Sequence, residues 1–123
     1  MEYELRANKQ TLIVSVRGEL DHHYADMIRQ KIDGELLSVR FKNLVFDFSG
    51  LTFMDSSGIG MVMGRYKNVS HLGGKVFIVC DSKTVTDRYG RNVPDGIERI
   101  LEMSGVFKII ERCESVDDAL RKV

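Results

Sequence analysis

The fold of this chain is decided by the stretch Phe53-Met54-Asp55-Ser56-Ser57-Gly58-Ile59-Gly60-Met61-Val62-Met63-Gly64-Arg65-Tyr66. Before it, the short apolar run 44–48 predicts a buried strand that ends at Ser49 and Gly50. Within it, apolar residues recur at helical spacing and predict one core-facing stripe of Ile59, Val62, Met63, Tyr66 and Val69. The stretch is therefore a strand-to-helix junction, and Asp55 or Ser56 is suited to cap the helix.

A second junction of this kind precedes it. Residues 12–17 predict a strand, paired with residues 3–7 across the turn at residues 8–10. Asp21 is a good cap for the next helix, whose predicted apolar face consists of Ala25, Ile28, Ile32, Leu36 and Val39. Gly34 weakens this helix by about 1 kcal/mol relative to alanine, so we expect an early end or a bend there.

Downstream, the Ser56 helix should end near Gly73 and Gly74, and residues 75–80 predict a central strand parallel to strand 44–48. Thr84, Val85 and Arg88 allow one helical turn, and residues 87–96 predict a surface loop. We expect a helix ending at Gly105, a last strand at residues 106–110 and a short helix capped by Ser115. The sum is one α/β domain, residues 1–123, with a mixed sheet of about four to five strands and about four helices.

Composition excludes several classes of protein. Lysine plus arginine (18) balances aspartate plus glutamate (18), so no net charge recruits nucleic acid or an anionic membrane. Cys80 and Cys113 make neither a disulfide framework nor a metal site. No apolar run approaches the roughly 18 residues that span a bilayer, and the first residues do not form a signal peptide. We expect a small cytoplasmic protein without cofactor or metal.

Two chemical interpretations of the junction are weak. Gly58, Gly60 and Gly64 match neither phosphate-binding glycine motif and fall inside the helical pattern, which disfavours a nucleotide-binding module. A serine hydrolase would need His22 or His23 to approach the serines from the neighbouring junction, and the nucleophile-elbow motif is absent. Two solvated histidines at a helix start are the simpler interpretation.

A modification site on a docking surface is the third interpretation. A phosphate on Ser56 would gain about 0.3–1 kcal/mol from the helix dipole and would add charge beside Asp55. Gly60 and Gly64 lie on the flank away from the core stripe, and Met61 also lies off that stripe, which suits the close approach of a partner. Two plainer alternatives stay open: Ser56 is only a cap, and the glycines pack under a neighbouring loop.

Four segments then carry a family resemblance: Gly18-Glu19-Leu20-Asp21-His22-His23, residues 53–60, Gly64-Arg65-Tyr66-Lys67 and Met103-Ser104-Gly105-Val106-Phe107-Lys108-Ile109-Ile110. In order, over nearly the whole chain, they resemble the anti-sigma factor antagonists of the STAS domain family. The Asp55-Ser56-Ser57-Gly58 block resembles the phosphorylatable antagonists, and the first segment resembles the sporulation branch, which antagonises the anti-sigma F factor.

The resemblance implies a regulatory binding protein, not an enzyme. The unphosphorylated form would bind an anti-sigma factor that is also a serine kinase and so free the sigma factor; phosphorylation of Ser56 would end binding, and a serine phosphatase would restore it. The expected partner-binding residues are Asp21, His22, Asp55, Ser57, Gly58, Gly60, Met61 and Gly64. A small-molecule or nucleotide-binding STAS-like module is the alternative.

One segment departs from the family pattern. Between Cys80 and Met103 the chain is longer than the pattern, with residues 88–96 as the expected insertion. Surface loops tolerate insertions, so the fold should survive, but partner choice could differ if this segment borders the docking surface.

Overall fold

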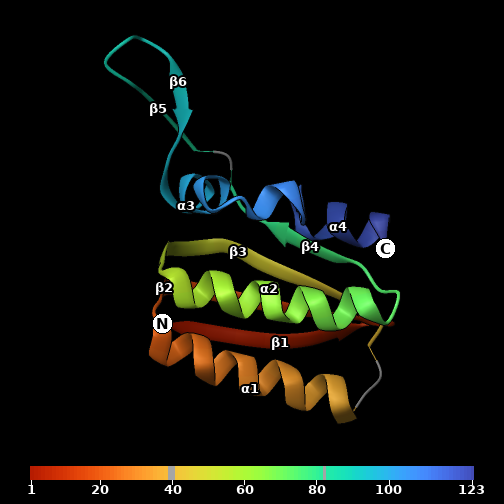
Figure 1. Cartoon of the computed structure of the whole chain (residues 1–123). Coiled ribbons are helices and arrows are strands. Elements are labelled where there is room, and N and C mark those ends of the chain that lie inside the picture. The colour runs from red at the N-terminus through yellow and green to blue at the C-terminus, as the bar shows by residue number, and fades with distance from the viewer. Residues whose placement is uncertain (39–40, 82) are drawn as a thin grey trace.

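A computed structural model describes residues 1–38, 41–81 and 83–123 of the chain. Its main sheet has five strands in the order β1-β2-β3-β4-β7, with β1 antiparallel to β2 and the others parallel (Figure 1). The elements in chain order are β1 Glu2–Asn8, β2 Thr11–Leu20, α1 His22–Ser38, β3 Asn43–Met54, α2 Ser56–His71, β4 Val76–Val79, β5 Thr84–Thr86, β6 Asn92–Pro94, α3 Gly96–Ser104, a 3-10 helix Val106–Lys108, β7 Glu111–Cys113 and α4 Val116–Lys122. The predicted mixed α/β fold is confirmed.

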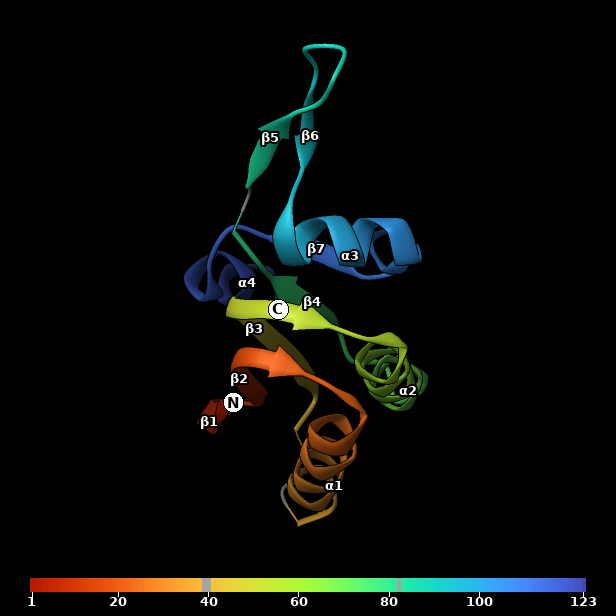
Figure 2. The ribbon, with the colours of Figure 1, turned by 90° about the vertical axis from the view of Figure 1, so that its left-hand side faces the viewer.

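Helices cover both faces of the sheet (Figure 2). The larger core packs α1, α2 and α3 on one face, around fully buried side chains such as Val14, Phe46 and Ile78. The smaller core packs α4 on the other face, where Ala119 meets Ile13, Val45, Phe77, Val79 and Cys113. All four residues of β4 are buried, as predicted for a central strand, because helices cover it from both sides.

The first junction is built as predicted. β1 and β2 form the expected hairpin, and Lys9 supplies its positive φ of 53°. Asp21 Oδ1 accepts a hydrogen bond from the Tyr24 amide at 3.1 Å, which caps α1. The expected early end at Gly34 is wrong, since α1 continues to Ser38 with Ala25, Ile28 and Ile32 buried and Leu36 partly buried. The predicted core position Val39 lies outside the described residues.

The predicted end of the third strand is also wrong. β3 continues through Ser49 and Gly50 to Met54, because its pairing with β2 resumes after an extra residue on β3: Ser15 pairs with Asp47, and Arg17 with Gly50. A second register shift follows between Gly18 and Glu19. A β-bulge absorbs such a residue without ending the strand. A Cβ on Gly50 would lie 2.7 Å from Cγ of Arg17, so a glycine suits this position.

Residues 83–110 differ most from expectation. The predicted helical turn and surface loop are instead a two-stranded antiparallel hairpin, β5–β6, which projects from the body (Figures 1 and 2). The predicted strand at residues 106–110 is wrong: Gly105, with a φ of 83°, ends α3, and the Ile110 amide donates to the Val106 carbonyl at 2.8 Å. Val106 and Ile110 are therefore buried one helical turn apart, and the last strand is β7.

The remaining predicted ends are confirmed. α2 stops at His71 before Gly73, whose φ is 84°, and Ser115 Oγ caps α4 by accepting from the Asp118 amide at 3.0 Å. Cys80 and Cys113 are free and buried. Within the described ranges no helix has the length and apolarity needed to cross a bilayer, and no three acidic, histidine or cysteine side chains gather as a metal site would require.

Candidate functional site

The two strand-to-helix junctions lie side by side at one end of the sheet. Leu20, the last residue of β2, pairs with Met54, the last residue of β3, and the Asp55 amide donates to the Leu20 carbonyl at 3.3 Å. The N-termini of α1 and α2 consequently face the same side of the molecule (Figure 1). The structure therefore brings together Asp21, His22, Asp55, Ser56 and Ser57.

Asp55, not Ser56, caps α2. Its Oδ1 accepts from the Ser57 amide at 2.9 Å and from the Gly58 amide at 3.4 Å. The Ser56 side chain is exposed and makes no hydrogen bond to any described residue. The interpretation of Ser56 as only a cap is therefore wrong, and its hydroxyl stands unused at the positive end of the helix.

Gly58 lies under this turn rather than on the surface. A Cβ at Gly58 would lie 2.7 Å from Cγ of Met54 and 3.3 Å from Cδ2 of Leu20. The glycine thus allows α2 to start directly against the paired ends of β2 and β3. It belongs to the helix, as the sequence pattern indicated, and is not part of a phosphate-binding loop ahead of it.

The core face of α2 is rotated from the predicted stripe. The buried residues are Gly58, Met61, Val62, Arg65 and Val69, while Ile59, Met63 and Tyr66 are only partly buried. The predicted exposure of Met61 is wrong: the residue is 5% exposed, because this side of α2 packs against α1 as well as the sheet. The predicted stripe assumed that α2 packs on the sheet alone, whereas it packs on both the sheet and α1.

The opposite flank of α2 is open, as predicted. Gly60 and Asn68 are exposed, and Gly64 is partly exposed. A Cβ built on Gly60 or Gly64 meets nothing within 4 Å. The alternative that a neighbouring loop covers these glycines is therefore wrong, and backbone is directly accessible along two turns of α2.

A shallow groove of about 230 Å³ lies between the first two turns of α1 and those of α2. It is lined by His22, Ala25, Asp26, Arg29, Ser57 and Met61. The Arg29 guanidinium donates to Asp26 and holds the pKa of that carboxyl below its usual value. His22 and Ser57 share the groove, but no hydrogen bond joins the two among the described residues, so the nucleophile–base pair of a hydrolase is not assembled here.

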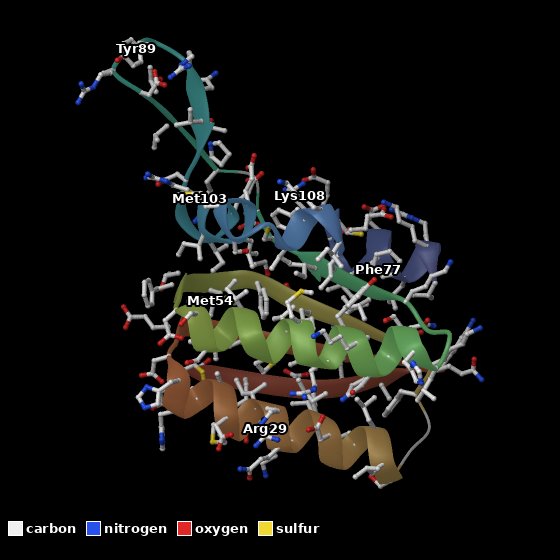
Figure 3. The ribbon with its side chains drawn as sticks, in the orientation of Figure 1. Arg29, Met54, Phe77, Tyr89, Met103 and Lys108 are labelled. Atoms are coloured by element: carbon white, nitrogen blue, oxygen red, sulfur yellow. The ribbon has the colours of Figure 1, made fainter. Side chains whose placement is uncertain are left out.

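A partly buried ion pair that the sequence did not predict joins the two helices. Arg65 of α2 is 8% exposed, and its Nε lies 3.0 Å from Oδ1 of Asp33 on α1. Burial lowers the pKa of the Arg65 guanidinium, and the Asp33 charge opposes that shift. Arg29, labelled in Figure 3, approaches the same carboxylate from Nη1 at 3.6 Å. One feature of the sequence does indicate this burial: Arg65 follows Met61 by one helical turn and so lies on the same face of α2.

Phe53 is a second residue that the sequence did not single out. It is 45% exposed two residues before Asp55, beside the start of α2. Large exposed aromatic residues next to an open helix flank are typical of protein-binding surfaces. We define the α2 surface as Phe53, Ser56, Ser57, Gly60 and Gly64, with His22 across the groove.

A family model described as the STAS domain matches residues 2–119. The chain is 35% identical to an anti-sigma F factor antagonist of Paenibacillus polymyxa over 123 residues, which are 100% of this chain and 95% of the relative. The solved structure of the unphosphorylated anti-sigma factor antagonist SpoIIAA has a TM-score of 0.70 at 24% identity, covering 98% of this chain and 96% of that one. Its phosphorylated form, from Bacillus, has a TM-score of 0.69 at 23% identity and covers 98% of both chains.

Proposed function

The chain belongs to the STAS domain family, and we propose that it is an anti-sigma factor antagonist controlled by phosphorylation of Ser56. One observation carries the proposal: the Ser56 hydroxyl is exposed and unpaired at a helix N-terminus whose cap is supplied by Asp55. The name of the Paenibacillus polymyxa relative supports the anti-sigma factor as the partner. We propose further that residues 1–123 act as one STAS domain that binds and does not catalyse.

The unmodified protein would dock through the α2 surface. Gly60 and Gly64 let a partner's backbone or side chains approach α2 closely, since no Cβ stands in the way. Phe53 would supply apolar contact area at one end and His22 a polar contact across the groove. Gly58 and Met61 are buried, so their part in binding would be to shape this surface from beneath, while Asp21 and Asp55 position the two helix starts.

Phosphorylation would then oppose docking. The anti-sigma factor, acting as a serine kinase, would join the Ser56 oxygen to the γ-phosphorus of ATP; ADP leaves, and a base of the kinase takes the hydroxyl proton. The phosphoserine carries a charge of about −1.5 to −2, and the positive end of the α2 dipole stabilises this charge. A docked partner would have to desolvate that charge beside the Asp55 carboxylate, which costs affinity. A serine phosphatase would reverse the switch.

The test uses the anti-sigma F factor of Paenibacillus polymyxa, the protein that the relative's name says is antagonised. The purified chain should bind it, and incubation with ATP should add one phosphate that mass spectrometry maps to Ser56. Ser56→Ala should abolish labelling, while Ser57→Ala, the matched control one residue away, should keep it. No binding, or phosphate on another residue, contradicts the proposal.

The alternative of a nucleotide-binding module receives no support from a specific residue, because Gly58 is packed against Met54 and Gly60 lies in the helix. Calorimetry with ATP and GTP in the absence of any partner would reveal it as saturable binding. We place the action of the protein in the cytoplasm, where free buried thiols such as those of Cys80 and Cys113 are usual.

A further inference from the structure

The hairpin β5–β6 is the feature that the proposed function leaves unused. We call residues 83–95 the arm. The arm leaves the body after β4 and returns at the start of α3, and its two strands stand clear of the sheet and of the helices (Figures 1 and 2). An isolated two-stranded hairpin is marginally stable in water, so its local order needs its own explanation.

The tip of the arm is ordered by Asp87. Its Oδ1 accepts from the Tyr89 amide at 2.8 Å and from the Arg91 amide at 3.0 Å, while its Oδ2 accepts from Arg91 Nε at 2.9 Å. The Asp87 amide donates to the Arg91 carbonyl at 2.9 Å, and Gly90 takes the required positive φ of 78°. These hydrogen bonds hold the pKa of the Asp87 carboxyl below its usual value. One carboxylate thus fixes the shape of the turn.

This turn presents an aromatic and a cationic side chain to solvent. Tyr89, labelled in Figure 3, is 73% exposed, and the Arg91 guanidinium lies 5.1 Å from the centre of its ring. Arg88 is exposed beside it, and Val85 adds apolar surface lower on the arm. Tyrosine and arginine are among the residues enriched at the energetic centres of protein interfaces, and a fixed turn lowers the entropy lost on binding.

The arm rises from the end of the molecule at which α2 begins (Figure 1). Its root lies against β3 close to Phe53, where Leu51, Thr52, Lys83, Asp95 and Gly96 line a small cleft. In both ribbon views α3 lies between the arm and α2. Met103, labelled on α3 in Figure 3, is 75% exposed. Exposed apolar or aromatic residues therefore occur near the end of β3, on α3 and on the arm, at Phe53, Met103 and Tyr89.

We propose that the arm is a second contact for the anti-sigma factor that docks on the α2 surface, with its tip seated on an apolar patch bearing carboxylates. This inference rests on the proposed function and extends it. Hydrogen bonds within the turn occupy the Asp87 carboxylate, so Arg88 is left as an exposed cation beside Tyr89. A cation next to an aromatic ring suits a partner surface that combines carboxylates with apolar area. The contact lies away from Ser56, so it acts independently of phosphorylation and raises affinity by a linked second attachment.

The test measures affinity for the Paenibacillus polymyxa anti-sigma F factor by calorimetry. The double variant Arg88→Ala/Tyr89→Ala removes the presented side chains, and Asp87→Ala keeps them but removes the bonds that fix the turn. The matched control Arg6→Ala/Tyr3→Ala removes the same residue types from β1, the edge strand of the sheet farthest from β7. Circular dichroism and thermal unfolding confirm that each variant is folded.

The double variant should bind about tenfold or more weakly, Asp87→Ala should lose part of the same affinity, and the control should match the wild type. At a saturating concentration of the anti-sigma factor, the tip variants should still be phosphorylated on Ser56 when ATP is added. If the wild type binds and the tip variants bind equally well, the arm inference is overturned while the proposed function stands. If the wild type does not bind, both are overturned. If the tip variants alter only self-association in sedimentation, the arm contacts a second copy of this chain and the inference is wrong.

Discussion

Asp21 and Asp55 are the first residues after two neighbouring strands, β2 and β3, and each caps the helix that follows it. Leu20 and Met54, the residues before them, pair in the sheet, and the carboxylates accept from the Tyr24 and Ser57 amides at 3.1 and 2.9 Å. The first-turn amides of α1 and α2 thus donate to aspartate carboxylates, and no serine hydroxyl is needed as a cap. This arrangement leaves Ser56 free for chemistry at a position where a hydroxyl usually serves as a cap.

Asp55→Ala should destabilise the protein by about 1 kcal/mol, the usual cost of losing an N-cap, and Asp55→Asn should cost less because its amide oxygen still accepts. Ser56→Ala should change the free energy of unfolding by less than about 0.5 kcal/mol, as expected for a surface substitution. Urea unfolding followed by circular dichroism measures all three. A loss at Ser56→Ala as large as at Asp55→Ala would mean that the serine is the cap.

Gly60→Ala and Gly64→Ala should each stabilise the fold by about 0.5–1 kcal/mol, because alanine favours the helix and the added methyl group meets nothing within 4 Å. Both should weaken binding of the anti-sigma factor, since the methyl groups stand on the α2 surface. Gly58→Ala is the contrast on the same helix and should destabilise, because its Cβ would lie 2.7 Å from Met54 Cγ. Thermal unfolding and calorimetry give the two readouts, and affinity unchanged by both methyl groups would remove α2 from the interface.

The sequence predicted those parts of the fold that follow from local pattern. The capped junctions at Asp21 and Asp55 and the buried β4 are confirmed because cap chemistry and apolar runs are local signals. The β3 bulge at Gly50 depends on pairing with Arg17, which is distant in the chain. The burial of Met61 and Arg65 depends on α1, and periodicity does not say how many neighbours a helix has. At the candidate site, the helical pattern predicted the exposure of Gly60 and Asn68 but not the burial of Met61.

Asp33→Ala should destabilise by about 1–3 kcal/mol, because it leaves the buried Arg65 guanidinium without its carboxylate. This expected loss of stability is smaller than for a fully buried ion pair, since the Asp33 side chain is 31% exposed. Replacing both partners, Asp33→Leu with Arg65→Met, should restore most of the loss. Asp26→Ala breaks an exposed pair with Arg29 and should leave the urea midpoint unchanged. Equal effects of Asp33→Ala and Asp26→Ala would show that burial of Arg65 is not the cause.

Both cysteine thiols should be unreactive in the folded protein. Burial raises the pKa of Cys80 and of Cys113 above the usual value, so at neutral pH less thiolate is present, and the side chains are covered. Labelling with a chromogenic disulfide reagent should be slow in buffer and should reach two thiols per chain in urea. Fast labelling of the native protein at either cysteine would contradict the packing of β4 or β7.

Ser56→Asp should weaken binding of the anti-sigma factor by about tenfold or more, because a carboxylate at this position must be desolvated when the partner docks. The folded state should tolerate the change, since a negative charge at the N-terminus of α2 is favourable there. Asn8→Asp adds the same charge in the β1–β2 turn, at the other end of β2 from Leu20, and should bind as the wild type does. Calorimetry measures the affinity, and thermal unfolding of the same samples shows whether each variant is still folded. An affinity for Ser56→Asp equal to that of Asn8→Asp would mean that charge at Ser56 does not reach the interface, and phosphorylation would then have to act by another route.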